Sequence, residues 1–166
     1  MAAFLVHYVF LFALALWVGG GAAISFIVAP AVFDKAGSRR LAGEIVGQIL
    51  RRFDTSVFVA GPIALLLAAF LVMAGTVGPS RTLTLQLGLV AGMLGLALYS
   101  RFALTPEIRR LRDQLGDQID QIPREDPRRR AFGRLHGFSV LCLLGEIVLG
   151  AFAMGTTVML LTARPG

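Results

Sequence analysis

Glu146 is the one charged residue in an otherwise apolar run that extends from Leu135 to Ala163. A run of this length can cross the hydrocarbon core of a bilayer as a helix, and Glu146 would then lie near the midplane. A carboxylate at that depth costs a few kcal/mol, so it needs a partner, water or a proton. Two interpretations stay open: a protonated side chain that bonds a neighbouring helix for packing, and a functional site that binds a cation or moves a proton.

Further polar side chains lie in or beside the apolar runs and are candidates for the same site. Besides Glu146, the candidate binding residues are Arg101, His136, Ser139, Ser25, Tyr99 and His7. Arg101 has two interpretations, because its long side chain can extend to the interface or reach toward Glu146. The polar side chains at the depth of Arg101 and His136 could line a cavity that opens to one side of the membrane.

The helical face that carries Glu146 is formed by small and polar residues. At helical spacing it includes Ser139, Cys142, Gly150, Ala153 and Thr157. We expect this face to turn toward the interior of a bundle. Cys142 is the only cysteine in the sequence, so the chain has no intramolecular disulfide and no cysteine cluster for zinc.

The two histidines raise the question of haem. His7 lies near one end of the first apolar run, and His136 lies at the opposite membrane face in the last run. At 1.5 Å per helical residue they stand roughly 20 Å apart or more, so they cannot both ligate one iron. Ligation by a single histidine stays open as an alternative to an interfacial hydrogen-bonding role. No cofactor and no metal site is predicted otherwise.

Composition identifies the elements that must hold these side chains. The chain has 166 residues, of which 56% are hydrophobic and only 16% are charged. Four long apolar runs predict membrane spans at about 4–29, 55–76, 83–104 and 134–161. The runs show no alternation with a period of two, which excludes a β-barrel. We expect an all-α bundle of four transmembrane helices in a single membrane domain, residues 1–166.

Basic residues alternate strongly between the five segments outside these spans. Their Lys plus Arg counts are 0, 5, 1, 9 and 1 in chain order. The positive-inside rule therefore places the second and fourth segments in the cytoplasm and both termini outside it. The formal net charge of +6 fits contact with anionic lipid headgroups beside the spans, and we do not expect nucleic acid as a partner.

The two basic connections carry helical patterns of their own. Residues 38–53 place apolar side chains on one face, which predicts either an amphipathic surface helix or an extension of the second span. Thr105 is the expected N-cap of a further helix that ends at Pro123. Asp126 and Pro127 repeat the same start signal before the last span. The connections are therefore expected to be amphipathic helices in the cytoplasm.

Small residues predict where the spans approach one another closely. In lipid, helices associate through close packing of small residues instead of the hydrophobic effect. Two stripes at helical spacing fit this role: Ala15, Gly19 and Ala23 in the first span, and Gly88, Gly92 and Gly95 in the third. We expect the first span to pack closely through its stripe, within the chain or across a dimer.

Several stretches resemble the DUF4149, or transmembrane protein 205-like, family of four-span membrane proteins. These stretches are "LWVGGGAAISFIVAPAVF", "LAGEIVGQILRRF", "YSRFALTPEIRRLR" and "FGRLHGFSVL", in this order. The residues that match the family pattern are Ala29, Pro30, Phe33, Arg101, Pro106, His136 and Ser139. Position 143, where the family is associated with asparagine, is leucine here. The resemblance implies a four-span bundle and no settled biochemical activity.

Three functional hypotheses follow from the sequence. The first is a non-enzymatic membrane protein whose polar intramembrane cavity binds or passes a small solute, a metal ion or a proton. The second is a structural or assembly subunit, as a homo-oligomer or within a larger membrane complex. The third is a redox protein linked to haem or porphyrin. Arginine outnumbers lysine 15 to 1, which favours a bacterial inner membrane as the location.

Overall fold

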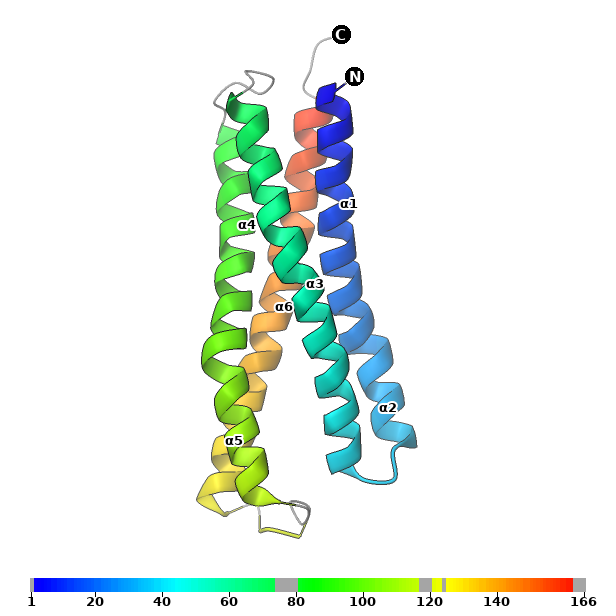
Figure 1. The fold of residues 1–166 in the computed structure, drawn as a ribbon, viewed down its shortest axis with the longest axis vertical. Helices are drawn as coiled ribbons and strands as arrows, with labels where there is room; N and C mark the ends of the chain where they lie inside the picture. Colours follow the sequence, from blue (N-terminus) through cyan, green and yellow to red (C-terminus); the bar gives the residue numbers. More distant parts are fainter. Residues whose placement is uncertain (1, 74–80, 117–120, 124, 163–166) are drawn as a thin grey trace.

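The computed structural model describes residues 2–73, 81–116, 121–123 and 125–162, and every regular element in these ranges is helical (Figure 1). The elements are α1 (Ala2–Ala23), η1 (Ile24–Val28), α2 (Ala29–Lys35), α3 (Arg39–Met73), α4 (Arg81–Tyr99), η2 (Ser100–Leu104), α5 (Thr105–Leu115) and α6 (Pro127–Thr162). The predicted all-α class is confirmed for this part of the chain.

Three of the helical rods are long and apolar enough to cross a membrane. They run over His7–Lys35, Arg81–Leu115 and Pro127–Leu160; they contain the predicted span 83–104 and most of the predicted spans 4–29 and 134–161. Many large apolar side chains are exposed on the bundle surface, among them Phe12, Phe26 and Phe152, which suits contact with lipid. These helices identify the chain as a membrane protein. The predicted span 55–76 falls mostly on α3, and its last residues lie outside the described ranges.

Helix α6 is the central element of the bundle. It packs against α4, α1 and α5, and α1 packs in turn against α3 (Figure 1). Leu14, Val90 and Met93 are almost completely buried between these helices, and Ala153 of α6 meets them. The face of α6 predicted to turn inward is buried at Cys142, Glu146, Gly150, Ala153 and Thr157 and half-buried at Ser139, which confirms that prediction over most of the face.

Two π-helical turns let proline sit inside long helices. Pro30 follows η1 and Pro106 follows η2, each by two residues. Proline has no N–H and clashes with the carbonyl four residues before it, and a wider π-turn makes room for that carbonyl. The helix therefore continues through Pro30 to Lys35.

The predicted boundaries of the connection after α4 need correction. Thr105 is not an N-cap, because the helix arrives from η2 without a break and the Thr105 hydroxyl donates to the Ser100 carbonyl at 2.9 Å. The helix ends at Leu115 and not at Pro123, because Gly116 adopts a positive φ of 63°, a conformation that favours glycine. The second start signal is confirmed: α6 begins at Pro127, and the Arg128 N–H donates to Asp126 at 2.8 Å.

Residues 38–53 do not form a separate surface helix. Helix α3 runs without a break from Arg39 to Met73, so these residues belong to the same helix as most of the predicted second span. Ala42 is fully buried and Leu41 is exposed, so this segment presents different faces to the bundle and to its surroundings. At 1.5 Å per residue, the 35 residues of α3 extend well beyond a hydrocarbon core of about 30 Å.

The predicted packing stripes are wrong in register within the chain. Ala15 and Gly19 are exposed and Ala23 is only half-buried, and a Cβ at Gly19 would meet nothing within 4 Å. Gly20 contacts Phe53 of α3 instead, and Gly21 contacts α6. On α4, Gly92 lies against Leu149, whereas Gly88 and Gly95 face open space. A helix as uniformly apolar as α1 gives no sequence signal for the face that turns inward. Packing of these stripes across a dimer stays a prediction.

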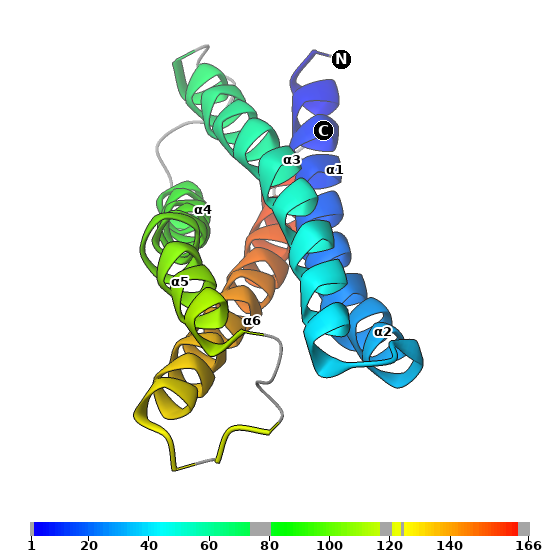
Figure 2. The ribbon, with the colours of Figure 1, turned by 60° about the horizontal axis from the view of Figure 1, so that its bottom comes forward.

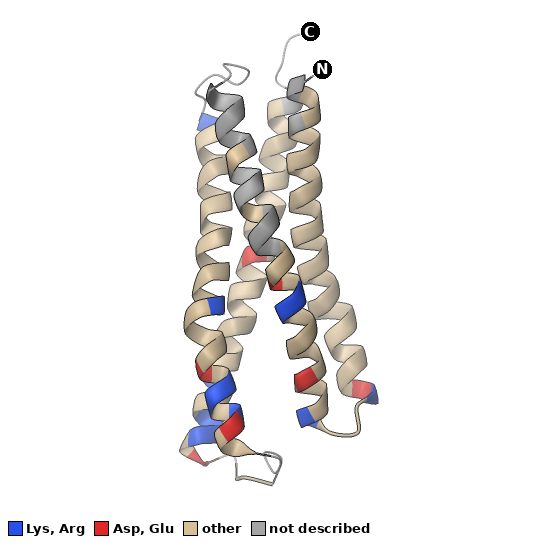
Figure 3. Cartoon of the chain, in the orientation of Figure 1, with Lys and Arg blue, Asp and Glu red and all other residues tan. Residues whose placement is uncertain are grey.

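Charged residues gather at one end of the bundle (Figure 3). This end holds α2, the beginning of α3, and α5 with the beginning of α6 (Figure 1). We call it the basic end. The two segments predicted to be cytoplasmic thus lie together, and α1 begins and α6 ends at the opposite end.

Candidate functional site

Glu146 is buried in the middle of α6, with 5% of its surface exposed. Its Oε2 atom accepts a hydrogen bond of 3.1 Å from Nε1 of Trp17 on α1, which is itself 4% exposed. Helix α1 thus provides the partner that a carboxyl group at this depth requires. Arg101, the partner considered from the sequence, lies near Asp54 of α3, and its positive charge acts on that carboxyl group.

A cavity of about 150 Å³ opens beside Glu146, toward the basic end. Figure 2 shows α2 and α3 on one side of this end, and α5 with the beginning of α6 on the other. The described residues that line the cavity are Phe33, Gly43, Val46, Gly47, Leu50, Arg51, Asp54, Ala97, Ser100, Thr105, Ile108, Arg109, Arg112, His136, Ser139, Val140, Leu143 and Glu146. We call it the Glu146 cavity.

Two carboxylates face the inner part of this cavity. Asp54 of α3 is close enough to Glu146 for the two groups to repel each other when both are ionised. Hydroxyl groups of Ser100 and Ser139 line the same space. Paired carboxylates with nearby hydroxyls can bind a cation, share a proton or accept hydrogen bonds from an amine.

Three arginines, Arg51, Arg109 and Arg112, line the cavity toward the basic end. We call them the cavity arginines. The Arg112 guanidinium donates to the Gly43 carbonyl of α3 at 3.4 Å and lies 5.8 Å from the centre of the Phe132 ring. Phe132 stacks in turn on His136, with ring centres 6.1 Å apart. Arg112 therefore connects α3, α5 and α6 at the cavity.

Glycines on α3 make room for these guanidinium groups. A Cβ at Gly43 would lie 3.5 Å from Arg112, and one at Gly47 would lie 3.5 Å from Arg51. Larger side chains at these two positions would fill the part of the cavity that the arginines occupy. The small residues of this segment thus keep the basic side of the cavity open.

The sequence-predicted binding residues divide into two groups. Glu146, His136 and Ser139 line one cavity. Arg101 lies one residue beyond Ser100 and interacts with Asp54 without lining the cavity, while Tyr99 is exposed and Ser25 is half-buried elsewhere on η1. His7 is buried near the start of α1, at the end of the bundle away from His136.

A second buried polar contact lies nearer the chain termini. Gln86 of α4 donates to the Thr157 hydroxyl of α6 at 2.7 Å, and Thr157 donates to the Ala153 carbonyl at 2.9 Å. Both side chains are buried, and neither lines the Glu146 cavity. These hydrogen bonds pair the polar groups of Gln86 and Thr157, so we interpret the contact as interhelical packing.

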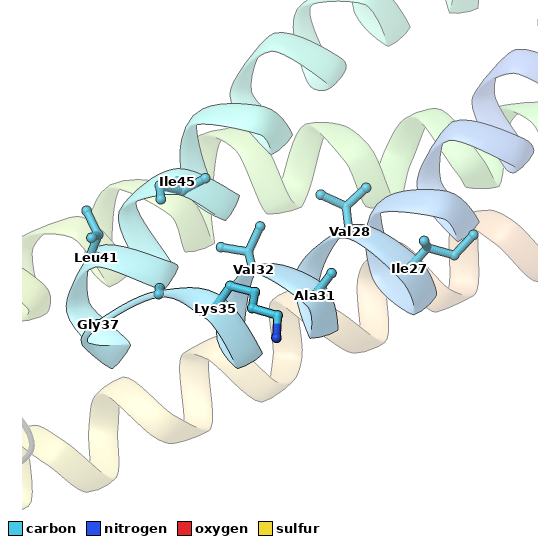
Figure 4. Close-up of a pocket in the computed structure, with 9 residues that line it drawn as sticks. Ile27, Val28, Ala31, Val32, Lys35, Gly37, Leu41 and Ile45 are labelled. Atoms are coloured by element: carbon cyan, nitrogen blue, oxygen red, sulfur yellow. The ribbon is translucent and has the colours of Figure 1, made fainter.

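An apolar groove lies between α2 and the beginning of α3 (Figure 4). Its lining residues are Ile27, Val28, Ala31, Val32, Lys35, Ala36, Gly37, Leu41 and Ile45. Lys35 is its one charged residue, and the ammonium group pairs with Asp34 at 3.1 Å. The groove offers no set of polar groups for chemistry.

The described residues include no group of three His, Cys, Asp or Glu side chains placed to hold a metal ion. Asp54 and Glu146 supply two carboxylates, so a cation there would need oxygen ligands from hydroxyls, carbonyls or water. His136 is engaged with Phe132 at the edge of the cavity.

Trp17, Asp54 and the three cavity arginines were not predicted as site residues. Trp17 is the single tryptophan of the chain, and a tryptophan in an apolar run usually finds a partner for its N–H. Asp54 directly precedes the second apolar run, so its place beside that run was visible in the sequence. Nothing in the sequence indicated that Arg51, Arg109 and Arg112, which come from separate segments, line one cavity.

Comparison with known proteins identifies one match. A protein-family model described as a domain of unknown function, DUF4149, matches residues 12–117. The match begins within α1, continues through α5 and ends before α6, and it includes Trp17, Asp54 and the cavity arginines. Neither the curated proteins nor the solved structures contain a match.

Proposed function

Because this chain belongs to the DUF4149 family, whose description assigns no function, we propose a function from the geometry of the Glu146 cavity. The protein is a non-enzymatic integral membrane protein that binds or passes a small solute, a metal ion or a proton through this cavity. Four helices span the membrane, α3 among them, and the cavity lies within the half of the bundle at the basic end.

One observation carries this proposal: the buried Glu146 carboxyl group borders a cavity together with a second carboxylate, Asp54. A buried polar group kept only for packing is enclosed and bonded to its neighbours, as Gln86 and Thr157 are. Glu146 has a partner in Trp17 and also borders open space. Ionisable residues that face a cavity inside a membrane protein commonly mark a path for ions, protons or substrates.

The charge distribution supports an orientation for the cavity. The basic connections gather at one end (Figure 3), and such segments favour the cytoplasmic side. We propose that the basic end faces the cytoplasm of a bacterium, against anionic headgroups of the inner membrane, and that both termini lie outside. The Glu146 cavity then opens to the cytoplasm.

Ligand-induced stabilisation of the purified protein tests this function. Thermal unfolding is measured at several pH values, with Mn²⁺ or Zn²⁺, and with a panel of small polar solutes. A ligand at about 100 times its Kd stabilises the folded state by about 2.7 kcal/mol. We expect at least one saturable response that Glu146→Gln removes.

Thr157→Val is the matched control for this experiment. It removes a buried interhelical hydrogen bond on α6 without changing the cavity lining, so it should lower stability but keep the response. The function is contradicted if no proton, metal or solute gives a response that depends on Glu146.

Assembly into a larger complex is the second candidate. Gly19, Gly88 and Gly95 are exposed, and each could take a side chain without a contact, so another helix could approach these faces closely. Stoichiometric copurifying subunits, or a dimer that Gly88→Leu disrupts, would favour this role. A Soret band in the purified protein would favour the haem-linked alternative.

A further inference from the structure

Arg51 of α3 and Arg109 and Arg112 of α5 converge on the Glu146 cavity. Exposed Arg40, Arg110 and Arg128 each lie within 4 Å of a carboxylate on their own segment. Among the described residues, no carboxylate forms such an ion pair with Arg51, Arg109 or Arg112. Within the described part of the chain, these three arginines therefore line one cavity without a carboxylate in ion-pair contact, and Glu44 and Asp113 act on Arg112 only from a longer distance. Guanidinium groups are well suited to phosphate or carboxylate, which they bind through paired hydrogen bonds.

The opposite charge lines the same cavity at Asp54 and Glu146. On α3, Arg51 and Asp54 are three residues apart, which corresponds to a rise of about 4.5 Å along the helix. A small molecule in this space therefore meets positive and negative groups within one helical turn. A bare anion would be repelled by the carboxylates, and a bare metal ion would be repelled by the three arginines.

These two observations point to a molecule that carries both charges. We propose that the Glu146 cavity binds a small zwitterion, with its phosphate or carboxylate at Arg51, Arg109 and Arg112 and its ammonium group toward Asp54 and Glu146. This inference rests on the proposed function and specifies its substrate class. An engineered protein cavity of about 150 Å³ binds benzene, so the space suits a solute of similar size or the headgroup of a lipid.

Thermal unfolding with matched probes tests the proposal. The zwitterions are glycine and phosphoethanolamine, and the single-charge controls are acetate, inorganic phosphate, methylammonium and ethanolamine. We expect a zwitterion to raise Tm saturably, with half-saturation at a concentration at least tenfold lower than that of either single-charge counterpart.

Variants on each side of the cavity locate the binding groups. Arg112→Gln and Asp54→Asn should each raise the half-saturating concentration at least tenfold. Arg110→Gln is the matched control, because Arg110 lies on the same helix, is exposed and pairs with Glu107 at 3.8 Å; it should leave the response unchanged. If Arg112→Gln fails to fold, Arg109→Gln replaces it.

Native mass spectrometry of the purified protein distinguishes two sources of the zwitterionic group, a lipid headgroup and a free solute. Retention of phosphatidylethanolamine in native mass spectrometry, lost in Arg112→Gln, would identify a lipid headgroup, and a response to the soluble probes alone would identify a free solute. Equal responses to phosphate and phosphoethanolamine would contradict the proposal, as would no response to either zwitterion in a protein that also retains no phosphatidylethanolamine. A remaining response to protons or Mn²⁺ would then leave the proposed function intact.

Discussion

The hydrogen bond from Trp17 to Glu146 connects α1 to α6 in the middle of the bundle, and its strength can be measured. Trp17→Phe removes the N–H donor that lies 3.1 Å from Glu146 Oε2. Both side chains are at least 95% buried, so surrounding solvent does not simply replace the bond. We predict that this substitution destabilises the protein through two separable effects.

The first effect is the lost hydrogen bond. A bond to a charged group contributes about 1.5–3 kcal/mol in soluble proteins, whereas interhelical bonds in a membrane protein average about 0.6 and reach about 1.7 kcal/mol. The cavity beside Glu146 gives its carboxyl group another place to find a partner, which favours the lower range. We therefore expect a coupling free energy of about 1 kcal/mol between the two side chains.

The second effect is the smaller ring, which leaves unfilled space in the core. A double-mutant cycle separates the two effects, because the packing loss is present with or without Glu146. The cycle combines Trp17→Phe with Glu146→Met and follows unfolding by circular dichroism, since fluorescence is lost with the only tryptophan. If the two single changes add within about 0.3 kcal/mol, the bond does not stabilise the bundle and the reasoning fails.

Two further predictions concern the packing and the beginning of α6. Gly20→Ala should lower Tm, because its Cβ would overlap the Phe53 ring, while Gly19→Ala, with nothing within 4 Å, should leave Tm unchanged or raise it; equal effects of the two variants would contradict this packing. Hydrogen bonds from Arg128 lower the pKa of Asp126 below its ordinary value. A lowered carboxyl pKa stabilises the folded form above the unfolded pKa, and this contribution is lost as pH falls through the folded pKa. The protection of the amides in the first turn of α6 against hydrogen exchange, measured relative to their intrinsic rates, should therefore fall below about pH 4. An equal fall in Asp126→Ala would refute the cap.

Local signals in the sequence predicted much of the helical framework. Asp126 and Pro127 begin a helix for two reasons. The Asp126 carboxylate accepts the backbone N–H of Arg128, and Pro127 has no N–H that would need a partner at the first helical position. The expected end at Pro123 was wrong because Gly116, with a positive φ, ends the helix earlier. Thr105 is of a residue type that is common at the N-cap of a helix, but the chain before it is already helical. Continuity with a preceding helix depends on the longer segment, which a cap motif does not describe.

The inward face of a helix was predictable only where its composition varied around the axis. On α6, Glu146 and small residues share one face, and that face is buried. On α1, glycine and alanine occur on every side, so the stripe through Gly19 and the contact through Gly20 could not be distinguished.

The candidate site was predictable in its centre and not in its surroundings. The cost of a carboxylate in lipid singles out Glu146 from sequence alone. Its partner Trp17 is 129 residues away in the chain, and the cavity arginines come from α3 and α5. Such contacts depend on how helices pair, which hydropathy does not specify.

Cysteine labelling of the cavity wall tests the central claim, that the space beside Glu146 is a polar cavity open at the basic end. Ser139→Cys is introduced into a Cys142→Ala background, and a membrane-impermeant thiol reagent is added to oriented vesicles from either side. Val148→Cys is the matched control. This position is exposed on the outer face of α6, where we expect lipid and not water, so it should not react with an impermeant reagent. We expect the residue at position 139 to react from the side of the basic connections alone; no reaction from either side would contradict an open polar cavity.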